Sequence, residues 1–225
     1  MPKDPLFSDR REAGRRLAAA LREYRGQNPV ILALPRGGVP VGFEVARALR
    51  ASLDVLLVRK IGAPGQPELG LGAIVDGSEP EIVLNQSVVD AVAPPSGYVE
   101  MEAQHQLAEL GRRRRSYTSN RPSPKLSGRT VIVVDDGIAT GGTVRAALRG
   151  IRRNEPACLV LAVPVAPAES LVELKPECDN IICLATPEPF YAVGPHYRDF
   201  TQTGDDEVVR LLGEAAGWAN QPTAN

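Results

Sequence analysis

The stretch T-V-I-V-V-D-D-G-I-A-T-G-G-T, residues 130–143, decides the fold class of this 225-residue chain. Its apolar part, Val131–Val134, is rich in β-branched residues, as is typical of a strand buried on both faces of a parallel sheet. Two acids and a loop rich in glycine and threonine follow, and the next residues have the pattern of a helix. We therefore predict a strand, an acidic pair, a tight loop and a helix in direct succession.

The loop after this strand has the composition of an anion-binding site. Glycine has no Cβ, so the backbone can turn tightly and bring its N–H groups close to a ligand. Those N–H groups lie at the start of a helix, where the macrodipole favours a bound anion. Two threonine hydroxyls add further donors. The residues concerned are Gly137, Thr140, Gly141, Gly142 and Thr143.

Asp135 and Asp136 are unexpected beside an anion. They make sense if the ligand also carries hydroxyl groups, or if a divalent metal lies between the carboxylates and the phosphates. An ordinary buried strand with a glycine-rich turn would explain the valine run. It gives no reason for two acids followed by T-G-G-T.

The run V-I-V-V-D-D-G-I-A-T-G-G-T resembles the phosphoribosyl-pyrophosphate (PRPP) signature of the type I phosphoribosyltransferases. The resemblance implies that the acids hold the ribose 2- and 3-hydroxyls, that the loop holds the 5-phosphate, and that Mg²⁺ is the cofactor. The acids would meet this metal directly, or through PRPP hydroxyls or water. The implied PRPP-binding residues are Asp135, Asp136, Gly137, Ile138, Ala139, Thr140, Gly141, Gly142 and Thr143.

A second strand, loop and helix occur earlier, with Val30–Leu34 as the strand and Val39–Arg50 as the helix. The loop between them carries an arginine, whose planar and permanently charged guanidinium suits pyrophosphate. The resemblance implies that this is the pyrophosphate loop, with a non-proline cis peptide bond around residues 35–37. A plain strand-to-helix turn is the alternative. The candidate pyrophosphate ligands here are Pro35, Arg36, Gly37 and Gly38.

The pattern predicts a further strand over Leu53–Val58, with Arg59 and Lys60 at its end. Strand ends that face the same way gather the ligand site of an open α/β sheet. We therefore assign both cations to pyrophosphate binding and, with Asp135 and Asp136, to catalysis. A solvated charge pair is the alternative for the two cations.

The rest of the chain alternates strands and helices, which predicts an α/β fold with a doubly wound, mostly parallel sheet. We expect one domain over residues 1–225 with its core at about 26–186. Residues 61–85 read as an inserted flexible loop that carries a β-hairpin. Residues 186–204, with a closing helix over Asp205–Trp218, would form a small C-terminal hood.

The segment 186–204 holds four of the few aromatic residues in the chain. Flat rings suit stacking on a planar ligand, and the family resemblance implies a hood over the acceptor. The alternative is that the rings only pack this segment onto the sheet. A histidine in the same segment is a candidate acid–base group. The acceptor-hood candidates are Phe190, Tyr191, His196, Tyr197 and Phe200.

The net charge and the cysteine content limit which partners and which cell compartment we expect for this protein. A net charge of −1 argues against a nucleic acid or a membrane surface as the main partner. The three cysteines are odd in number and lack metal-ligand spacing, which favours a reduced, cytoplasmic protein. The run Arg112–Arg115 is interpreted as a solvated helix end, or alternatively as a contact with polyphosphate.

We also expect the protein to form a homodimer.

The reaction implied by the resemblance is Mg²⁺-dependent transfer of phosphoribose from PRPP to a nitrogenous, nucleobase-like acceptor, with release of pyrophosphate. The acceptor stays open. Where the 6-oxopurine branch of the family has an Asp before the first loop threonine, this chain has Ala139. Two alternatives remain: a PRPP-sensing regulatory protein without turnover, and a hydrolase of a phosphorylated pentose.

Overall fold

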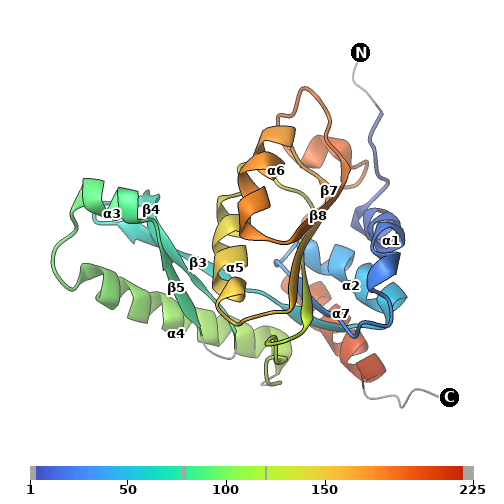
Figure 1. Ribbon diagram of the computed structural model, residues 1–225, viewed down its shortest axis with the longest axis horizontal. Coiled ribbons are helices and arrows are strands. Elements are labelled where there is room, and N and C mark those ends of the chain that lie inside the picture. Colours follow the sequence, from blue (N-terminus) through green and yellow to red (C-terminus); the bar gives the residue numbers. More distant parts are fainter. Residues whose placement is uncertain (1–3, 78–79, 120, 220–225) are drawn as a thin grey trace.

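A computed structural model of the protein describes residues 4–77, 80–119 and 121–219. Its centre is a five-stranded parallel sheet with the strand order β2-β1-β6-β7-β8 (Figure 1). The strands are β1 (Val30–Ala33), β2 (Ser52–Val55), β6 (Thr130–Val134), β7 (Cys158–Val165) and β8 (Asn180–Ala185). The stretch that opens the sequence analysis therefore contributes the central strand.

Helices cover both faces of this sheet. Alternate residues of β6 point to opposite faces, so that Ile132 and Val134 join one apolar cluster, and Val131 and Val133 the other. The first face carries α1 (Arg10–Ala20), α2 (Gly38–Leu49) and α7 (Asp205–Ala219); the second carries α5 (Gly142–Arg152) and α6 (Ala168–Leu174). The doubly wound α/β architecture is confirmed. Short 3₁₀ turns lie at Arg22–Tyr24, Lys175–Glu177 and Gly194–His196.

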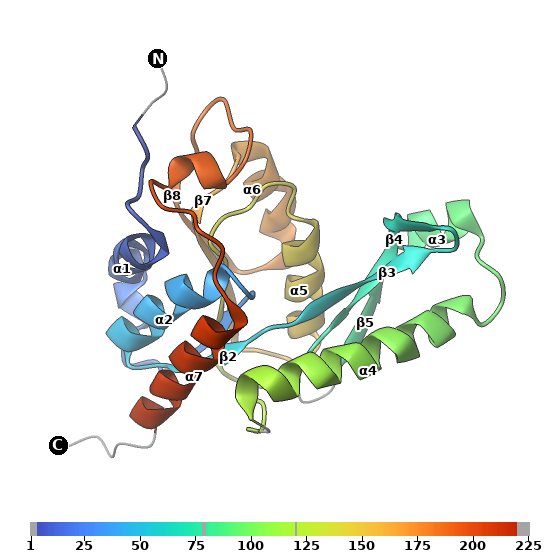
Figure 2. The same cartoon turned by 180° about the vertical axis from the view of Figure 1, so that it is seen from behind.

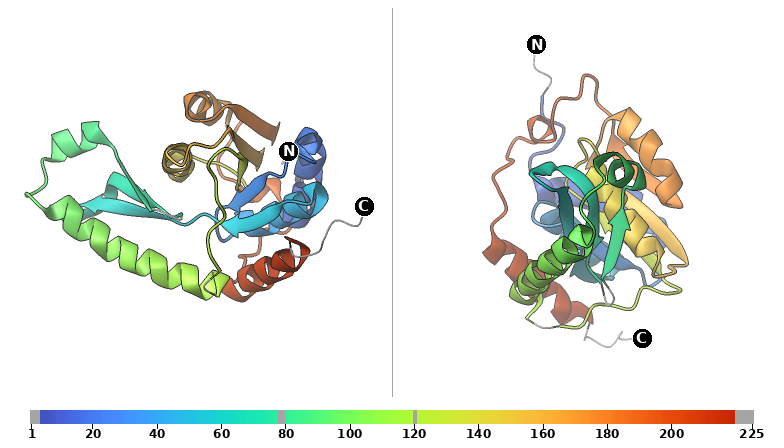
Figure 3. Two further views of the ribbon diagram at one scale, coloured as in Figure 1. Left: turned by 60° about the horizontal axis from the view of Figure 1, so that its bottom comes forward. Right: turned by 90° about the vertical axis from the view of Figure 1, so that its left-hand side faces the viewer.

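A separate unit, which we call the arm, extends from one edge of the core (Figures 1 and 3). It combines a three-stranded antiparallel sheet of order β3-β4-β5 with two helices. Its elements are β3 (Val58–Ala63), β4 (Gln66–Val75), β5 (Glu81–Leu84), α3 (Gln86–Val92) and α4 (Tyr98–Thr118). The predicted β-hairpin of the inserted segment is present as the antiparallel pair β3–β4, and β5 and the long helix α4 extend it into a small backed sheet.

The predicted strand over residues 53–58 is wrong in its boundaries. The core strand β2 ends at Val55, and Val58 already begins β3 of the arm. Arg59 and Lys60 consequently lie inside an antiparallel strand and not at the end of a core strand. The apolar run from Leu53 to Val58 is continuous apart from Asp54, so hydrophobicity alone does not mark the point where the chain leaves one sheet for another.

The hood lies against the N-terminal segment. Phe7 pairs with Tyr197 in an isolated parallel bridge, and the Phe7 carbonyl accepts a hydrogen bond from the Arg198 backbone N–H at 2.8 Å. Figure 2 shows the two segments side by side. Among the residues that the structure describes, no helix is both long and apolar enough to cross a membrane.

Candidate active site

The two acids follow β6 directly but lie in different surroundings. The Asp135 Oδ1 accepts a hydrogen bond from the Asp136 backbone N–H at 2.9 Å. Burial raises the pKa of Asp135 well above its usual value, and the neighbouring Asp136 charge adds to this rise. The Asp135 carboxyl therefore retains a proton more readily than an exposed aspartate does.

Asp136 turns toward α1. Its Oδ2 accepts a hydrogen bond from Arg10 Nε at 2.7 Å, and the two side chains are only 14% and 11% exposed. Burial raises the pKa of Asp136, while the Arg10 guanidinium opposes that rise. The loop of residues 35–38 closes onto the same carboxylate, because a Cβ placed on Gly37 would stand 1.9 Å from Asp136 Oδ2.

Asp135 lines a cavity of about 270 Å³ at the carboxyl ends of β1, β2 and β6. Arg59 of the arm, Arg113 of α4 and Thr143 of the loop line the same cavity. The Arg59 Nε donates to Gln106 Oε1 at 3.0 Å, which fixes its side chain against α4. One acid, one hydroxyl and two guanidiniums thus surround one space. The remaining lining residues are Leu34, Pro35, Leu56, Leu57, Val58 and Leu110.

The glycine-rich loop leaves the start of α5 uncapped. Gly141 is the N-cap, in the left-handed region at φ 74°, and no side chain satisfies the first N–H groups of the helix. These groups have no acceptor within the helix. The loop is held from behind, since Ile138 N–H donates to the Val165 carbonyl at 2.9 Å and Ser170 Oγ donates to the Ala139 carbonyl at 2.8 Å. The arrangement presents backbone donors to an anion.

Arg59 and Lys60 point to different cavities, as neighbours on a strand do. Lys60 lines a larger space of about 770 Å³ between the arm and α5, together with Thr140 and Gly142 of the loop. Its Nζ donates to the Glu68 carbonyl at 2.6 Å and to Glu68 Oε2 at 3.1 Å. Of the two cations, Arg59 is the one that shares a cavity with Asp135.

The loop after β1 has the backbone that the resemblance implies: the peptide bond between Pro35 and Arg36 is cis. Gly38 lies close to the end of β6, because a Cβ there would stand 2.8 Å from the Val134 carbonyl oxygen. The Arg36 guanidinium lies 3.9 Å from the Asp205 carboxylate at the start of α7. This loop therefore connects the acid pair with the closing helix.

The five hood candidates divide by environment. Tyr197 is buried, and its hydroxyl donates to the Asp136 carbonyl at 2.5 Å. Phe200 stacks against Tyr197 at 5.1 Å between ring centroids. Phe190 stacks on His196, whose Nε2 is buried and has no hydrogen-bond partner among the described residues. Burial lowers the pKa of His196. Tyr191 is 86% exposed.

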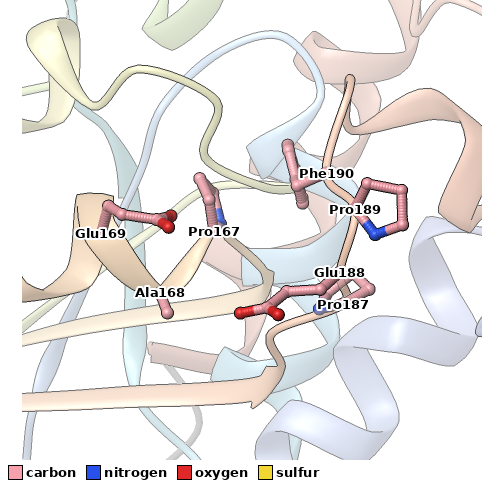
Figure 4. A pocket seen from close by; sticks show the side chains of 7 residues that line it. All are labelled: Pro167, Ala168, Glu169, Pro187, Glu188, Pro189 and Phe190. Carbon is pink, nitrogen blue, oxygen red and sulfur yellow. The ribbon is translucent and has the colours of Figure 1, made fainter.

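Phe190 lines a cavity of about 500 Å³ between α6 and the hood (Figure 4). Glu169 approaches it from α6 and Glu188 from the hood. Carboxylates accept hydrogen bonds and attract cations, so this cavity suits a ligand with N–H donors. The other residues that line it are Pro167, Ala168, Pro187 and Pro189.

The run of four arginines on α4 splits into different roles, because successive helix positions face different directions. Arg113 lines the cavity beside Asp135, and its Nε lies 3.2 Å from the Tyr117 hydroxyl. Arg114 is largely buried between Asp54 and Asp76. Arg112 pairs with Glu109 at the surface, and Arg115 is exposed.

Several side chains at the site were not among the sequence candidates, and Arg10 and Gln106 are two of them. Both contact a candidate residue from a helix distant in sequence, and neither belongs to a local motif. Each lies on a helix that carries charges of both signs, so nothing in the local sequence distinguishes either residue as part of the site. Arg113 was foreseen only as one member of the arginine run.

The carboxylates of the candidate site are compatible with a magnesium ion that is bound mainly by substrate phosphates and water. Within the described part of the chain, no group of three His, Cys, Asp or Glu side chains is placed to hold a metal. Asp135 faces the cavity, whereas Asp136 is paired with Arg10. Mg²⁺ typically binds through one or two carboxylates, substrate phosphates and water. The single cavity-facing carboxylate is compatible with that mode.

Comparison with known proteins agrees with this geometry. A family model described as "Phosphoribosyl transferase domain" matches residues 9–197. Proteins from two strains of Mycobacterium tuberculosis, each named "Putative phosphoribosyl transferase", are 48% identical over 210 residues, which is 93% of this chain and 47% of theirs. The chain thus spans about half the length of these curated relatives.

A solved structure extends the likeness to three dimensions. The crystal structure of TT1426 from Thermus thermophilus is 44% identical in sequence, has a TM-score of 0.81, and covers 92% of this chain and 98% of its own. The resemblance inferred from residues 131–143 and the predicted fold class are both confirmed. The chain belongs to the phosphoribosyl transferase domain family.

Proposed function

We propose that this protein transfers phosphoribose from PRPP to a nitrogenous, nucleobase-like acceptor and releases pyrophosphate, with Mg²⁺ as cofactor. The observation that carries the proposal is the cavity in which Asp135, Thr143, Arg59 and Arg113 meet. PRPP has the matching groups: a ribose ring with hydroxyls, a 5-phosphate and a pyrophosphate. An uncapped helix start adjoins the same cavity.

Each part of PRPP has a candidate partner. The 5-phosphate would accept hydrogen bonds from the N–H groups of residues 137–143 and from the threonine hydroxyls. Asp135 would accept from a ribose hydroxyl, and Asp136 would stand next to it. Arg59 and Arg113 would pair with pyrophosphate oxygens, since guanidinium binds such groups in bidentate fashion. Residues 35–38 would complete the pyrophosphate site.

Displacement at the anomeric carbon builds positive charge on the ribose and negative charge on the departing pyrophosphate. The carboxylates would stabilise the first charge and the guanidiniums the second, in a partly buried site where such interactions are strong. Bound Mg²⁺ would supply further neutralisation of the pyrophosphate oxygens. Catalysis would then rest on positioning and electrostatics rather than on a protein nucleophile.

The acceptor would bind under the hood, in the cavity lined by Phe190, Glu169 and Glu188. A planar ring can stack on Phe190, and the two carboxylates favour an acceptor with several N–H donors. Ala139 supplies no carboxylate, so a proton released from the acceptor would have to reach another group. Glu169 lies on α6. The next residue of that helix, Ser170, donates its hydroxyl to the Ala139 carbonyl.

The test is pyrophosphate release from PRPP and Mg²⁺, with and without a panel of nucleobases, alongside calorimetric PRPP binding. We expect binding, and release only when an acceptor is present. The Asp135→Asn variant should bind PRPP more weakly and turn over at least about 100-fold more slowly, a loss typical of removing one transition-state contact.

Other outcomes would replace this proposal. Binding without release for any acceptor would favour the sensor. Release together with ribose 5-phosphate in the absence of a base would favour the hydrolase. Absence of PRPP binding in the wild-type protein would contradict both the transferase and the sensor.

A further inference from the structure

Arg10 contacts three different parts of the site. Its Nε donates to Asp136 Oδ2 at 2.7 Å, and its Nη1 donates to the Thr201 carbonyl at 2.8 Å. Its Cζ lies 3.9 Å from the centroid of the Phe200 ring. The side chain is 11% exposed. One guanidinium therefore joins an acid of the site to the backbone and to an aromatic ring of the hood.

Arg10 is held in place by its own helix. It is the first residue of α1, and Asp9 caps that helix by accepting from the Glu12 backbone N–H at 2.7 Å. Immediately before the cap, the Ser8 carbonyl accepts from the Asp199 backbone N–H at 2.9 Å. The hood is thus fastened to the chain on either side of the point where α1 starts.

The hood reaches Asp136 by two routes. Tyr197 donates its hydroxyl to the Asp136 main-chain carbonyl, and Arg10 connects the Asp136 carboxylate to Thr201. Gly37 of the pyrophosphate loop closes against the same carboxylate. Any displacement of the hood therefore pulls on Asp136, and any rotation of Asp136 alters the support of the hood.

We propose that Arg10 is a positioning residue that fixes the hood, and with it the acceptor cavity, relative to the acid pair. The inference rests on the transferase function proposed above. It assigns to Arg10 no contact with PRPP, because the cavity beside Asp135 is lined from β1, the arm, α4 and the loop, and not from α1.

The proposal predicts that loss of Arg10 affects the binding of the two substrates differently. Loss of the guanidinium leaves the loop of residues 137–143 and Arg59 in place, so the Kd for PRPP should change by less than about threefold. The acceptor would meet a hood that is no longer held to Asp136. Its KM should rise at least about tenfold, and kcat should fall, because small misplacement of reacting groups is costly.

The experiment compares Arg10→Gln and Arg10→Lys with Arg15→Gln, whose side chain is exposed on the same helix. Steady-state kinetics, with the nucleobase from the panel that supports pyrophosphate release as the varied acceptor, give its KM and kcat. Calorimetry gives the Kd for PRPP. Amide hydrogen exchange over residues 187–204 reports the hood without any turnover. We expect this difference between the two substrates and faster hood exchange in Arg10→Gln, partial rescue in Arg10→Lys, and wild-type behaviour in Arg15→Gln.

The outcomes separate this inference from the function on which it rests. Equal loss of PRPP and acceptor binding in Arg10→Gln, or hood exchange as slow as in the wild type, would overturn the role of Arg10. If the wild-type protein shows no transfer to any base, the proposed function fails. The exchange data then decide alone whether Arg10 holds the hood. Should Arg10→Gln not fold, the same comparisons are made with Arg10→Lys.

Discussion

At the scale of single residues, the two neighbouring acids should respond to neutralisation to different extents. Asp135 is half-buried and has a raised pKa, so the folded state binds its proton more tightly than the unfolded state does. Stability is therefore lost as pH rises above the ordinary aspartate value of about 4. Asp135→Asn removes this cost. We expect its Tm at pH 7 to exceed that of the wild type by at least about 2 °C, with the gain vanishing toward pH 4.

Asp136→Asn is the matched comparison. It leaves Arg10 with little solvent exposure and without its carboxylate partner. The pKa of Asp136 is raised too, but the Arg10 guanidinium opposes that rise, so we expect a smaller gain in stability than in Asp135→Asn, or none, read from urea titrations of both variants at pH 7. A gain in Asp136→Asn as large as that in Asp135→Asn would show that the acids do not differ as the structure indicates.

The sequence predicted where the two acids lie but not how their surroundings differ. The position of both acids at the end of a buried strand follows from the sequence Val131–Asp136 alone. Their partners do not, because Arg10 lies 126 residues from Asp136 and no spacing rule links them. Likewise, the paired cations at 59 and 60 look equivalent in sequence. Only strand geometry shows that one faces Asp135 and the other faces away.

At the scale of elements, Arg114 fastens the arm to the core. It donates to Asp54 Oδ2 of β2 at 2.5 Å and also to Asp76, which follows β4. Replacing it by Met leaves two buried carboxylates without a cation. We expect a loss of about 3–5 kcal/mol, measured by urea unfolding at pH 7. Arg112→Met is the control, since Arg112 is 69% exposed and solvent weakens its pairing with Glu109.

The same substitution has a predictable pH dependence. Burial raises the pKa of Asp76, and the Arg114 charge opposes that rise. Without Arg114 the folded-state pKa rises further, so the folded protein binds the proton more tightly. The destabilisation should therefore be smaller at pH 5 than at pH 7. An effect that is equally large at pH 5, or larger, would contradict the titration of Asp76 in this cluster.

Element patterns predicted most of the core because each strand or helix carries its own periodicity. The alternation of apolar runs and amphipathic segments was enough for the doubly wound sheet. The junction after Val55 was missed, since residues 56–58 continue the apolar run while the chain passes to another sheet. A change of partner strand leaves no mark in local hydrophobicity.

At the scale of the whole molecule, the site is an assembly of distant parts. The central strand and its loop supply Asp135 and Thr143, the arm supplies Arg59 and Arg113, and the hood meets α1 over Asp136. Sequence reasoning named most of these segments through their resemblance to a family. It could not place the arm against the core, because that contact depends on side-chain pairs such as Arg114 with Asp54.

The most direct test of the central claim is a crystal structure of the protein with PRPP and Mg²⁺. The account predicts the 5-phosphate on the N–H groups of residues 137–143, a ribose hydroxyl within hydrogen-bond distance of Asp135, and pyrophosphate oxygens against Arg59. An empty loop in a crystal that binds PRPP elsewhere, or a ribose turned away from Asp135, would contradict it.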